Sequence, residues 1–355
     1  MLIPKTNIKS LHRINDIGGN RKQFIRLDKN ERTVPFSKEI YNEMMASINI
    51  NDLSTYPDQT ELYCALSNFY DLSEDHFLIT PGSDAGIKYI FDTFVQNNCK
   101  ILSLSPTYAM VDVYTKMFEA IPIKIGFDEN LNVDILSLIN SISNVDLVYI
   151  ANPNQPTGTI ISIEQIIKIL IKAKENNVLV LVDEAYIQFS NQASCIKLIK
   201  SFSNLIIAHT FSKGFGLASV RLGYLMSQSF FIDSIRKVKP ILDINLFAIK
   251  FGTYLLNNYN IVEEYINHVK QSKIFIEKHL NKNGIDCISG HANFIHLKFP
   301  KKYDTGIIAR RMKERGYLVR SSGNGLPAVL EGCIRITVGP LKQMKLFVDQ
   351  LLNIL

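Results

Sequence analysis

Residues 210–221 read TFSKGFGLASVR, which places Lys213 in a turn of small and apolar residues. An amine must lose its proton before it forms a Schiff base with an aldehyde, and apolar surroundings favour its neutral form. The Ser212 hydroxyl can donate a hydrogen bond to a phosphate oxygen, and the Arg221 guanidinium can bind the same group through two N–H bonds. The segment therefore suits an aldehyde that carries a phosphate, although an ordinary surface lysine in a glycine-rich turn would look similar.

A buried strand with a carboxylate at its end lies upstream of this lysine. Residues 178–182 are unbroken and apolar, as expected for a central strand of a parallel sheet, and Asp183 follows directly. Ligands of α/β proteins gather at the carboxyl ends of such strands. Asp183 is therefore a candidate site residue, and a solvated aspartate at a strand end is the alternative.

A second phosphate-binding pattern follows the apolar strand expected at residues 77–80. The chain continues through Gly82, Ser83 and Asp84, and a helix is expected to run from there through Phe94. Free backbone N–H groups at a helix N-terminus, exposed by a glycine turn, bind anions. We therefore expect this turn to bind the phosphate through its main chain.

Two prolines and a glycine shape a loop after a third strand. Residues 146–151 form the strand, and residues 152–158 read NPNQPTG, which excludes regular structure and predicts a rigid loop. Further apolar strands are expected at 101–104, 121–125 and 205–209, with helical segments between several of the strands. The pattern predicts an α/β fold whose large domain has a mainly parallel sheet covered by helices.

These motifs, in this order, resemble those of the fold-type I aminotransferases of class I and II, and especially the histidinol-phosphate aminotransferase group. The resemblance covers nearly the whole chain. It implies pyridoxal 5'-phosphate as the cofactor and a smaller α+β domain at the C-terminus. It also implies that Lys213 forms the Schiff base and acts as general base, that Asp183 pairs with the ring nitrogen, and that Tyr186 bonds the cofactor phenolate.

The remaining cofactor contacts are carried over from the same motifs. The resemblance places the turn 82–84, Ser212 and Arg221 at the phosphate, and the ring of Tyr108 against the pyridine ring.

One position departs from the family pattern. The residue before Pro-Thr-Gly is usually an asparagine that donates to the phenolate oxygen, and this chain has Gln155 there. Glutamine carries the same donor on a longer stem. Either Gln155 or Asn154 is therefore expected to make this bond.

Two motifs near the N-terminus bear on the substrate and on assembly. Asn30 lies in a stretch, RLDKNE, that in the similar enzymes lines the substrate entrance. Tyr56 begins a Tyr-Pro-Asp turn whose tyrosine reaches the phosphate in the neighbouring subunit of those enzymes. The resemblance therefore implies a homodimer, whereas a polar turn and a surface tyrosine are the alternatives.

The C-terminal part contributes two arginines. Arg335 alternates with apolar residues in CIRITVG at 333–339, and an arginine on a half-buried strand needs an anionic partner. The resemblance implies that this partner is the substrate α-carboxylate, with an internal salt bridge as the alternative. Arg320 precedes the glycine-rich segment 321–325 and is a candidate for a second anionic group, such as a substrate phosphate.

The order of motifs also predicts how the chain divides. We expect an N-terminal arm over residues 1–35, a large cofactor-binding domain over 36–261, and a small domain over 262–355 that part of the arm completes. One helical region, broken at Pro240, is expected over 235–268.

Composition excludes several other classes of protein. The net charge of +6, from 39 basic and 33 acidic residues, is dispersed and does not indicate nucleic-acid binding. Five scattered cysteines without a Cys-x-x-Cys pair suggest free thiols in a reducing compartment, so we expect a cytoplasmic protein without a disulfide or zinc framework. The histidines show no metal-ligand spacing, and no apolar run is long enough to suggest a signal peptide or a membrane span.

The sequence therefore predicts a pyridoxal-phosphate-dependent aminotransferase that moves an amino group between glutamate and a phosphorylated small-molecule amine. An amino-acid-phosphate decarboxylase on the same scaffold, acting on a compound such as phosphoserine or phosphothreonine, is the alternative within this fold. A regulator with a DNA-binding module is disfavoured because the expected arm is too short to contain one.

Overall fold

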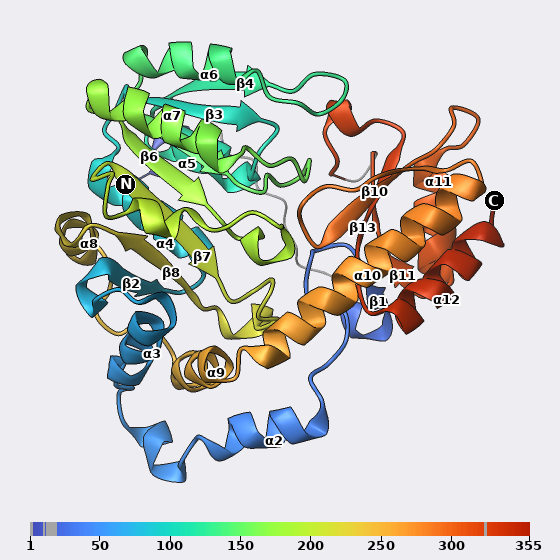
Figure 1. Ribbon diagram of the computed structural model, residues 1–355, viewed down its shortest axis with the longest axis horizontal. Helices are drawn as coiled ribbons and strands as arrows, with labels where there is room; N and C mark the ends of the chain where they lie inside the picture. The colour runs from blue at the N-terminus through green and yellow to red at the C-terminus, as the bar shows by residue number, and fades with distance from the viewer. Residues whose placement is uncertain (1–2, 10, 12–19, 323–324) are drawn as a thin grey trace.

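The computed structural model describes residues 3–9, 11, 20–322 and 325–355. Gly323 and Asn324, in the glycine-rich segment that follows Arg320, lie outside the described residues. The described chain forms two lobes, each built on a sheet of four or more strands with helices around it, and a further two-stranded sheet pairs the arm with the smaller lobe. The long helix α10 (Asn260–Lys282) runs from one lobe into the other (Figure 1).

The larger lobe is built on a sheet to which seven strands of the described chain contribute. Only β8 runs antiparallel to its neighbours, so the sheet is mainly parallel, as the apolar runs in the sequence predict. In spatial order, the strands are β2 (Phe77–Thr80), β8 (Gly223–Ser227), β7 (Leu205–Thr210), β6 (Leu179–Asp183), β5 (Leu147–Ala151), β3 (Lys100–Ser105) and β4 (Ile121–Gly126).

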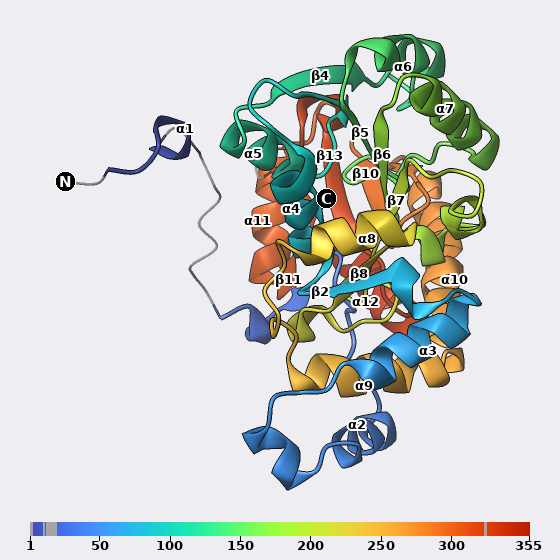
Figure 2. The same cartoon turned by 90° about the vertical axis from the view of Figure 1, so that its left-hand side faces the viewer.

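Helices cover both faces of this sheet and create two separate cores (Figures 1 and 2). The alternation of side chains along β6 shows the division, since Val180 and Val182 belong to one core and Leu181 to the other. The core of Leu181 is closed by α4 (Ser83–Phe94), α5 (Ala109–Met117) and α8 (Ser229–Arg236). The core of Val180 is closed by α3 (Thr60–Tyr70), α6 (Ile135–Ser141), α7 (Ile163–Glu175) and α9 (Leu246–Asn257).

The break expected at Pro240 is confirmed, but the helical region expected over 235–268 consists of separate helices and continues beyond residue 268. The chain leaves α8 at Arg236, crosses a non-helical segment around Pro240, and forms α9 before α10 begins. Residue 262, where we expect the small domain to begin, is the third residue of α10. The limits of the domains stay a prediction.

The smaller lobe pairs helices with an antiparallel sheet. In spatial order, its strands are β12 (Arg320–Ser321), β13 (Cys333–Thr337), β10 (Phe294–Lys298) and β9 (Asp286–Ile288). The helices packed with it are α10, α11 (Thr305–Glu314) and α12 (Leu341–Leu352).

The N-terminal arm joins this smaller lobe. Strand β1 (Ile25–Arg26) pairs in parallel with β11 (Tyr317–Leu318), and the Thr337 N–H donates to the Leu27 carbonyl at 2.8 Å. The arm also contains α1 (Thr6–Lys9), and α2 (Lys38–Ala46) then leads to the larger lobe, beginning where the Ser37 hydroxyl caps its first turn. In the described part of the chain, no helix combines the length and the apolar character needed to cross a membrane.

Candidate active site

A cavity of about 380 Å³ lies where the arm, the carboxyl ends of the parallel strands and the smaller lobe meet. The sequence motifs converge on it because parallel strands end at the same edge of a sheet. The predicted site residues that line it are Asn30, Ser83, Asp84, Tyr108, Gln155, Asp183, Tyr186, Ser212, Lys213, Arg221, Arg320 and Arg335.

One end of the cavity is formed by the turn before α4 and by Arg221. The backbone at Gly82 has a φ of 82°, and a Cβ added there would lie 2.7 Å from Nη2 of Arg221. Gly82 therefore does not line the cavity itself but allows the guanidinium to approach the helix N-terminus. The Nη1 of Arg221 donates to the Ser212 hydroxyl at 3.4 Å and to the Ala218 carbonyl at 3.0 Å.

Lys213 is half-buried in the cavity wall, so it is not the surface lysine that the sequence left open. Its Nζ donates to the Lys29 carbonyl at 3.0 Å and lies 5.6 Å from the centre of the Tyr186 ring. The Tyr186 hydroxyl in turn accepts a hydrogen bond from Nδ2 of Asn30 at 3.0 Å. Phe211 and Phe215, which flank the lysine in the sequence, are buried with their ring centres 4.3 Å apart and supply the apolar packing of the turn.

Asp183 ends β6 as a buried carboxylate, which excludes the solvated alternative. Burial raises its pKa to about 6, because the ion has lost water. Hydrogen bonds from the Tyr149 hydroxyl at 2.8 Å and the Ala185 N–H at 3.1 Å, together with the charge of His209, oppose that rise. Tyr149 was not identified from the sequence. The one signal in the sequence is that Tyr149 carries the single polar side-chain group in an otherwise aliphatic strand.

A second buried network, also missed from the sequence, lies beside Asp183. Glu184 is fully buried, and its Oε2 lies 2.7 Å from Nε2 of His209. The same carboxylate accepts hydrogen bonds from the Cys195 N–H at 2.7 Å and the Ser194 hydroxyl at 2.5 Å. Glu184 therefore ties the strand end to the following loop, while its neighbour Asp183 faces the cavity.

The structure also separates the two candidate amides. Asn154 is buried, and its Nδ2 donates both hydrogen atoms, to the Pro106 carbonyl at 3.1 Å and to the Thr157 hydroxyl at 2.9 Å. Its Oδ1 accepts from Thr107 at 2.8 Å. Asn154 therefore braces the loop from outside the cavity lining, and Gln155 is the amide that lines the cavity. The prediction that Asn154 serves as the cofactor donor is not supported by this geometry.

Tyr56 lies away from the cavity of its own chain. It precedes α3, and 82% of its surface is exposed. Tyr108 lies in the cavity wall beside Asp84, and burial raises the pKa of its phenol above the ordinary value.

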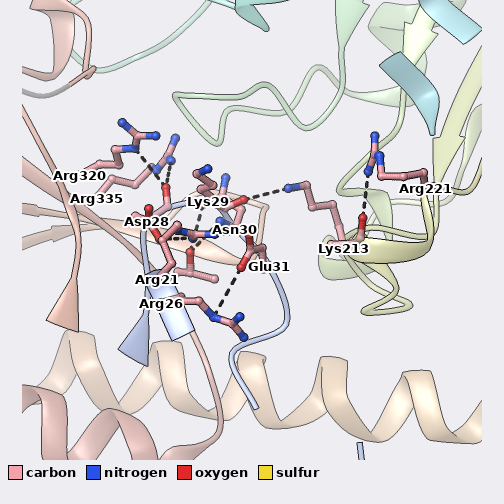
Figure 3. Close-up of polar contacts among 12 residues, drawn as sticks. Arg21, Arg26, Asp28, Lys29, Asn30, Glu31, Lys213, Arg221, Arg320 and Arg335 are labelled. Atoms are coloured by element: carbon pink, nitrogen blue, oxygen red, sulfur yellow. Dashed lines mark hydrogen bonds and ion pairs between the residues drawn. The ribbon is translucent and has the colours of Figure 1, made fainter. Parts of the chain in front are cut away.

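The two arginines of the smaller lobe are cross-strand partners in β12 and β13 (Figure 3). Nη2 of Arg335 donates to the Asp28 carbonyl at 2.8 Å, and Nε of Arg320 donates to the same oxygen at 3.4 Å. Burial lowers the pKa of Arg335 to about 10, and its Nε has no hydrogen-bond partner among the described residues. The carboxylates of Asp28 and Glu31 are bound instead by Arg21, at 2.6 and 2.9 Å.

Within the part of the chain that the structure describes, the internal salt bridge left open for Arg335 is not formed. The two guanidinium groups therefore face the cavity with only a neutral carbonyl as a shared acceptor. Arg335 is buried almost completely, so an anionic ligand would relieve a substantial cost of desolvation.

Comparison with known proteins agrees with this geometry. Residues 22–351 match the model of the family described as aminotransferase class I and II. The chain belongs to the class I and II aminotransferases. It is 32% identical over 321 residues to the histidinol-phosphate aminotransferase of Caldanaerobacter subterraneus subsp. tengcongensis, with 88% of each chain covered.

Solved structures confirm the fold of this aminotransferase. The histidinol-phosphate aminotransferase of Clostridium acetobutylicum superposes with a TM-score of 0.83 at 25% identity, covering 93% of this chain and 98% of its own. The enzyme of the same name from Sinorhizobium meliloti, solved with pyridoxal-5'-phosphate, superposes with a TM-score of 0.86 at 21% identity, covering 99% and 98%. The predicted fold type I architecture is therefore confirmed, and membership of the class I and II aminotransferases confirms the dependence on pyridoxal phosphate.

The cavity of this aminotransferase fits such a cofactor. A cradle that a Cβ at Gly82 would fill, a hydroxyl and a guanidinium suit a phosphate, and the buried carboxylate of Asp183 suits a protonated ring nitrogen. Lys213, which lines the same cavity, supplies the amine. Among the described residues, no group of three or more histidine, cysteine, aspartate or glutamate side chains could hold a metal ion.

Proposed function

We propose that this aminotransferase moves an amino group between glutamate and a phosphorylated amine and carbonyl pair similar to histidinol phosphate. The observation that carries the proposal is the pair Arg320 and Arg335, two cations that face the cavity with a main-chain carbonyl as their shared acceptor. Glutamate presents two carboxylates and a phosphorylated amine presents a dianion, so one pair of cations can serve both substrates. The names of the relatives support the same substrate class.

We also propose which residues hold the cofactor. The main chain of residues 82–84, with Ser212 and Arg221, binds the phosphate, and Tyr108 packs against the ring. The set of polar ring contacts consists of Asp183 at the ring nitrogen and of Tyr186 and Gln155 near the phenolate oxygen. When bound, pyridoxal 5'-phosphate supplies the aldehyde that carries the amino group and a ring that accepts electron density.

The remaining steps belong to side chains of the protein. Lys213 anchors the cofactor and then moves a proton at the substrate Cα, for which its position between the Lys29 carbonyl and the Tyr186 ring suits it. Arg335 orients the substrate carboxylate, and Arg320 binds the second anionic group. Asn30, held by Tyr186, Thr337 and Asn293, closes the substrate side of the cavity.

We further propose a cytoplasmic homodimer in which Tyr56 reaches the cavity of the neighbouring subunit. Apolar side chains are also exposed on the chain segment that precedes Tyr56, at Tyr41, Ile50 and Leu53, and we infer that the assembly covers them. The five cysteines are free thiols, which fits a reducing compartment. Sedimentation of a monomer at micromolar concentration would contradict the dimer.

The substrate class is tested by following each half of the reaction separately. The change in cofactor absorbance is recorded with glutamate and with amines that carry or lack a phosphate. We expect phosphorylated amines to react faster than their dephosphorylated counterparts. A preference for unphosphorylated aromatic or aliphatic amino acids would contradict the proposal, and release of carbon dioxide from phosphoserine or phosphothreonine would favour the decarboxylase.

Two variants assign the arginines in the same assay. Arg335→Lys keeps the charge but loses the fork of N–H groups, so we expect the glutamate half-reaction to slow by roughly tenfold or more. Arg320→Ala is expected to slow the phosphorylated amine more than glutamate. Equal losses for both substrates in Arg320→Ala would show that Arg320 does not bind the phosphate.

A further inference from the structure

The hydrogen bond between Tyr149 and Asp183 joins two residues that are buried in the middle of the sheet. Tyr149 lies in β5 opposite Leu181 of β6, so its side chain and that of Asp183 emerge on the same face. The Tyr149 ring is fully buried, and its hydroxyl donates to Oδ2 of Asp183 at 2.8 Å. Tyr149 contacts Asp183 from the side away from the cavity, because Asp183 lines the cavity and Tyr149 does not.

The two oxygens of the Asp183 carboxylate are both anchored by the protein. Oδ2 accepts from the Tyr149 hydroxyl and Oδ1 accepts from the Ala185 N–H at 3.1 Å. Two donors, one on each oxygen, fix the plane of the carboxylate. Each oxygen keeps a second lone pair, so the group can still accept a hydrogen bond from the cavity.

The surroundings of Asp183 divide into groups that favour its charge and groups that oppose it. Burial and the carboxylate of Asp84, at the start of α4, favour the neutral acid. His209 of β7 and the Tyr149 hydroxyl favour the ion, whereas the Tyr108 phenol, nearby in the wall, is held neutral by burial and by these carboxylates. The Tyr149 bond is first among the contributions that offset burial.

We propose that Tyr149 is a positioning residue that keeps the Asp183 carboxylate ionised and oriented toward the ring nitrogen of the cofactor. The inference rests on the proposed role of Asp183. A single proton is shared between the ring nitrogen and the carboxylate, and it stays on the nitrogen only while the anion is the better-stabilised form. Loss of the Tyr149 hydroxyl destabilises the anion, so the proton equilibrium shifts toward Asp183 and the ring nitrogen loses its proton at a lower pH.

The test is a direct observation of that proton. Wild type, Tyr149→Phe and the control Tyr265→Phe are reconstituted with pyridoxal phosphate that carries ¹⁵N in its ring, and the nitrogen resonance is followed against pH. Tyr265 is a matched control because its ring is also buried and its hydroxyl accepts from the Thr33 N–H, far along the chain from Asp183. We expect the midpoint of ring-nitrogen titration to fall by about one pH unit or more in Tyr149→Phe, a tenfold change in the proton equilibrium.

The outcomes separate the inference from the function on which it rests. Unchanged titration in Tyr149→Phe, with a protonated nitrogen in wild type, would overturn the role of Tyr149 alone. An unprotonated nitrogen in wild type would overturn the role of Asp183 and with it the inference. A midpoint that falls equally in Tyr265→Phe would also overturn the inference, because the effect would then be general loss of packing.

A second substitution covers the case in which Tyr149→Phe does not fold. Fluorinated tyrosine incorporated at position 149 keeps the ring and the hydroxyl but makes the phenol a stronger donor. We expect the midpoint to rise relative to wild type. A midpoint that stays or falls would contradict the inference.

Discussion

At the scale of single residues, the site joins a lysine, a buried carboxylate and three arginines, and the surroundings of these groups differ. Burial removes water from the Asp183 carboxylate, and hydrogen bonds offset part of that cost. Burial also removes water from the Arg335 guanidinium, where a carbonyl oxygen offsets part of the cost. The Nζ of Lys213 donates to the Lys29 carbonyl, which comes from the N-terminal arm (Figure 3). These differences predict different effects when each residue is changed.

Lys213 is expected to be the covalent anchor of the cofactor. Borohydride reduction of the purified enzyme should fix the pyridoxyl group on Lys213, and Lys213→Ala should lose both the covalent cofactor and nearly all turnover. Peptide mapping of the reduced protein checks this. A pyridoxyl group found on another lysine would show that the site is assigned wrongly.

Asp183→Asn is expected to impair the chemistry far more than the occupancy of the cofactor. An amide cannot hold the ring nitrogen protonated, and loss of a buried electrostatic contribution of this kind costs about 4 kcal/mol in the barrier, roughly three orders of magnitude in rate. Single-turnover kinetics with glutamate measures the loss, with cofactor content determined in parallel. A rate near that of wild type would contradict the assigned role.

At the scale of elements, the strands were predictable and several of their partners were not. Apolar runs such as 178–182 identify strands because a parallel sheet buries both faces. Strands β1 and β11 are only two residues long and are too short to leave a sequence pattern. Tyr149 was missed because its contact with Asp183 depends on the register of two strands.

The two lobes also touch through a pair of glycines. Gly158 follows the loop that carries Gln155, and a Cβ added at Gly290 of the smaller lobe would lie 2.6 Å from its Cα and carbonyl oxygen. We expect Gly290→Ala to lower the free energy of unfolding by about 1–3 kcal/mol through overpacking. Chemical denaturation measures the change.

The control for that substitution is Gly126→Ala. A Cβ at Gly126 meets no heavy atom within 4 Å, so its effect should stay within about 0.5 kcal/mol. Equal losses in the two variants would show that the contact between the lobes is not the cause.

At the scale of the whole molecule, the ionised Asp183 carboxylate that the reaction needs lowers the stability of the folded protein when the cofactor is absent. Burial raises the pKa of this carboxyl from 3.8 to about 6, so the folded chain prefers it protonated. Below about pH 4 the acid is neutral in the folded and the unfolded protein, so the raised pKa does not change the free energy of unfolding. As pH rises to about 6, the cost of ionising the buried group grows, and above that it is constant.

Cofactor-free Asp183→Asn is therefore expected to gain stability relative to wild type as pH rises from about 4 to 6. The gain should level off above pH 6 at no more than about 3 kcal/mol, the free energy of the pKa difference. Urea denaturation of both cofactor-free proteins at several pH values measures it. A difference that does not depend on pH would contradict the raised pKa.

The pairing of the arm with the smaller lobe has a consequence for how the enzyme is made. The Asn30 N–H donates to the Thr337 hydroxyl, and β1 has its partner in β11, so the first and last parts of the chain share one wall of the cavity. A ribosome releases the arm early and β13 only near the end of synthesis. The nascent chain can fold its large sheet while it is still attached, but it must hold the arm unpaired until almost every residue has emerged. The complete cavity therefore forms only late in synthesis, and a chain that ends before β13 lacks part of the active site.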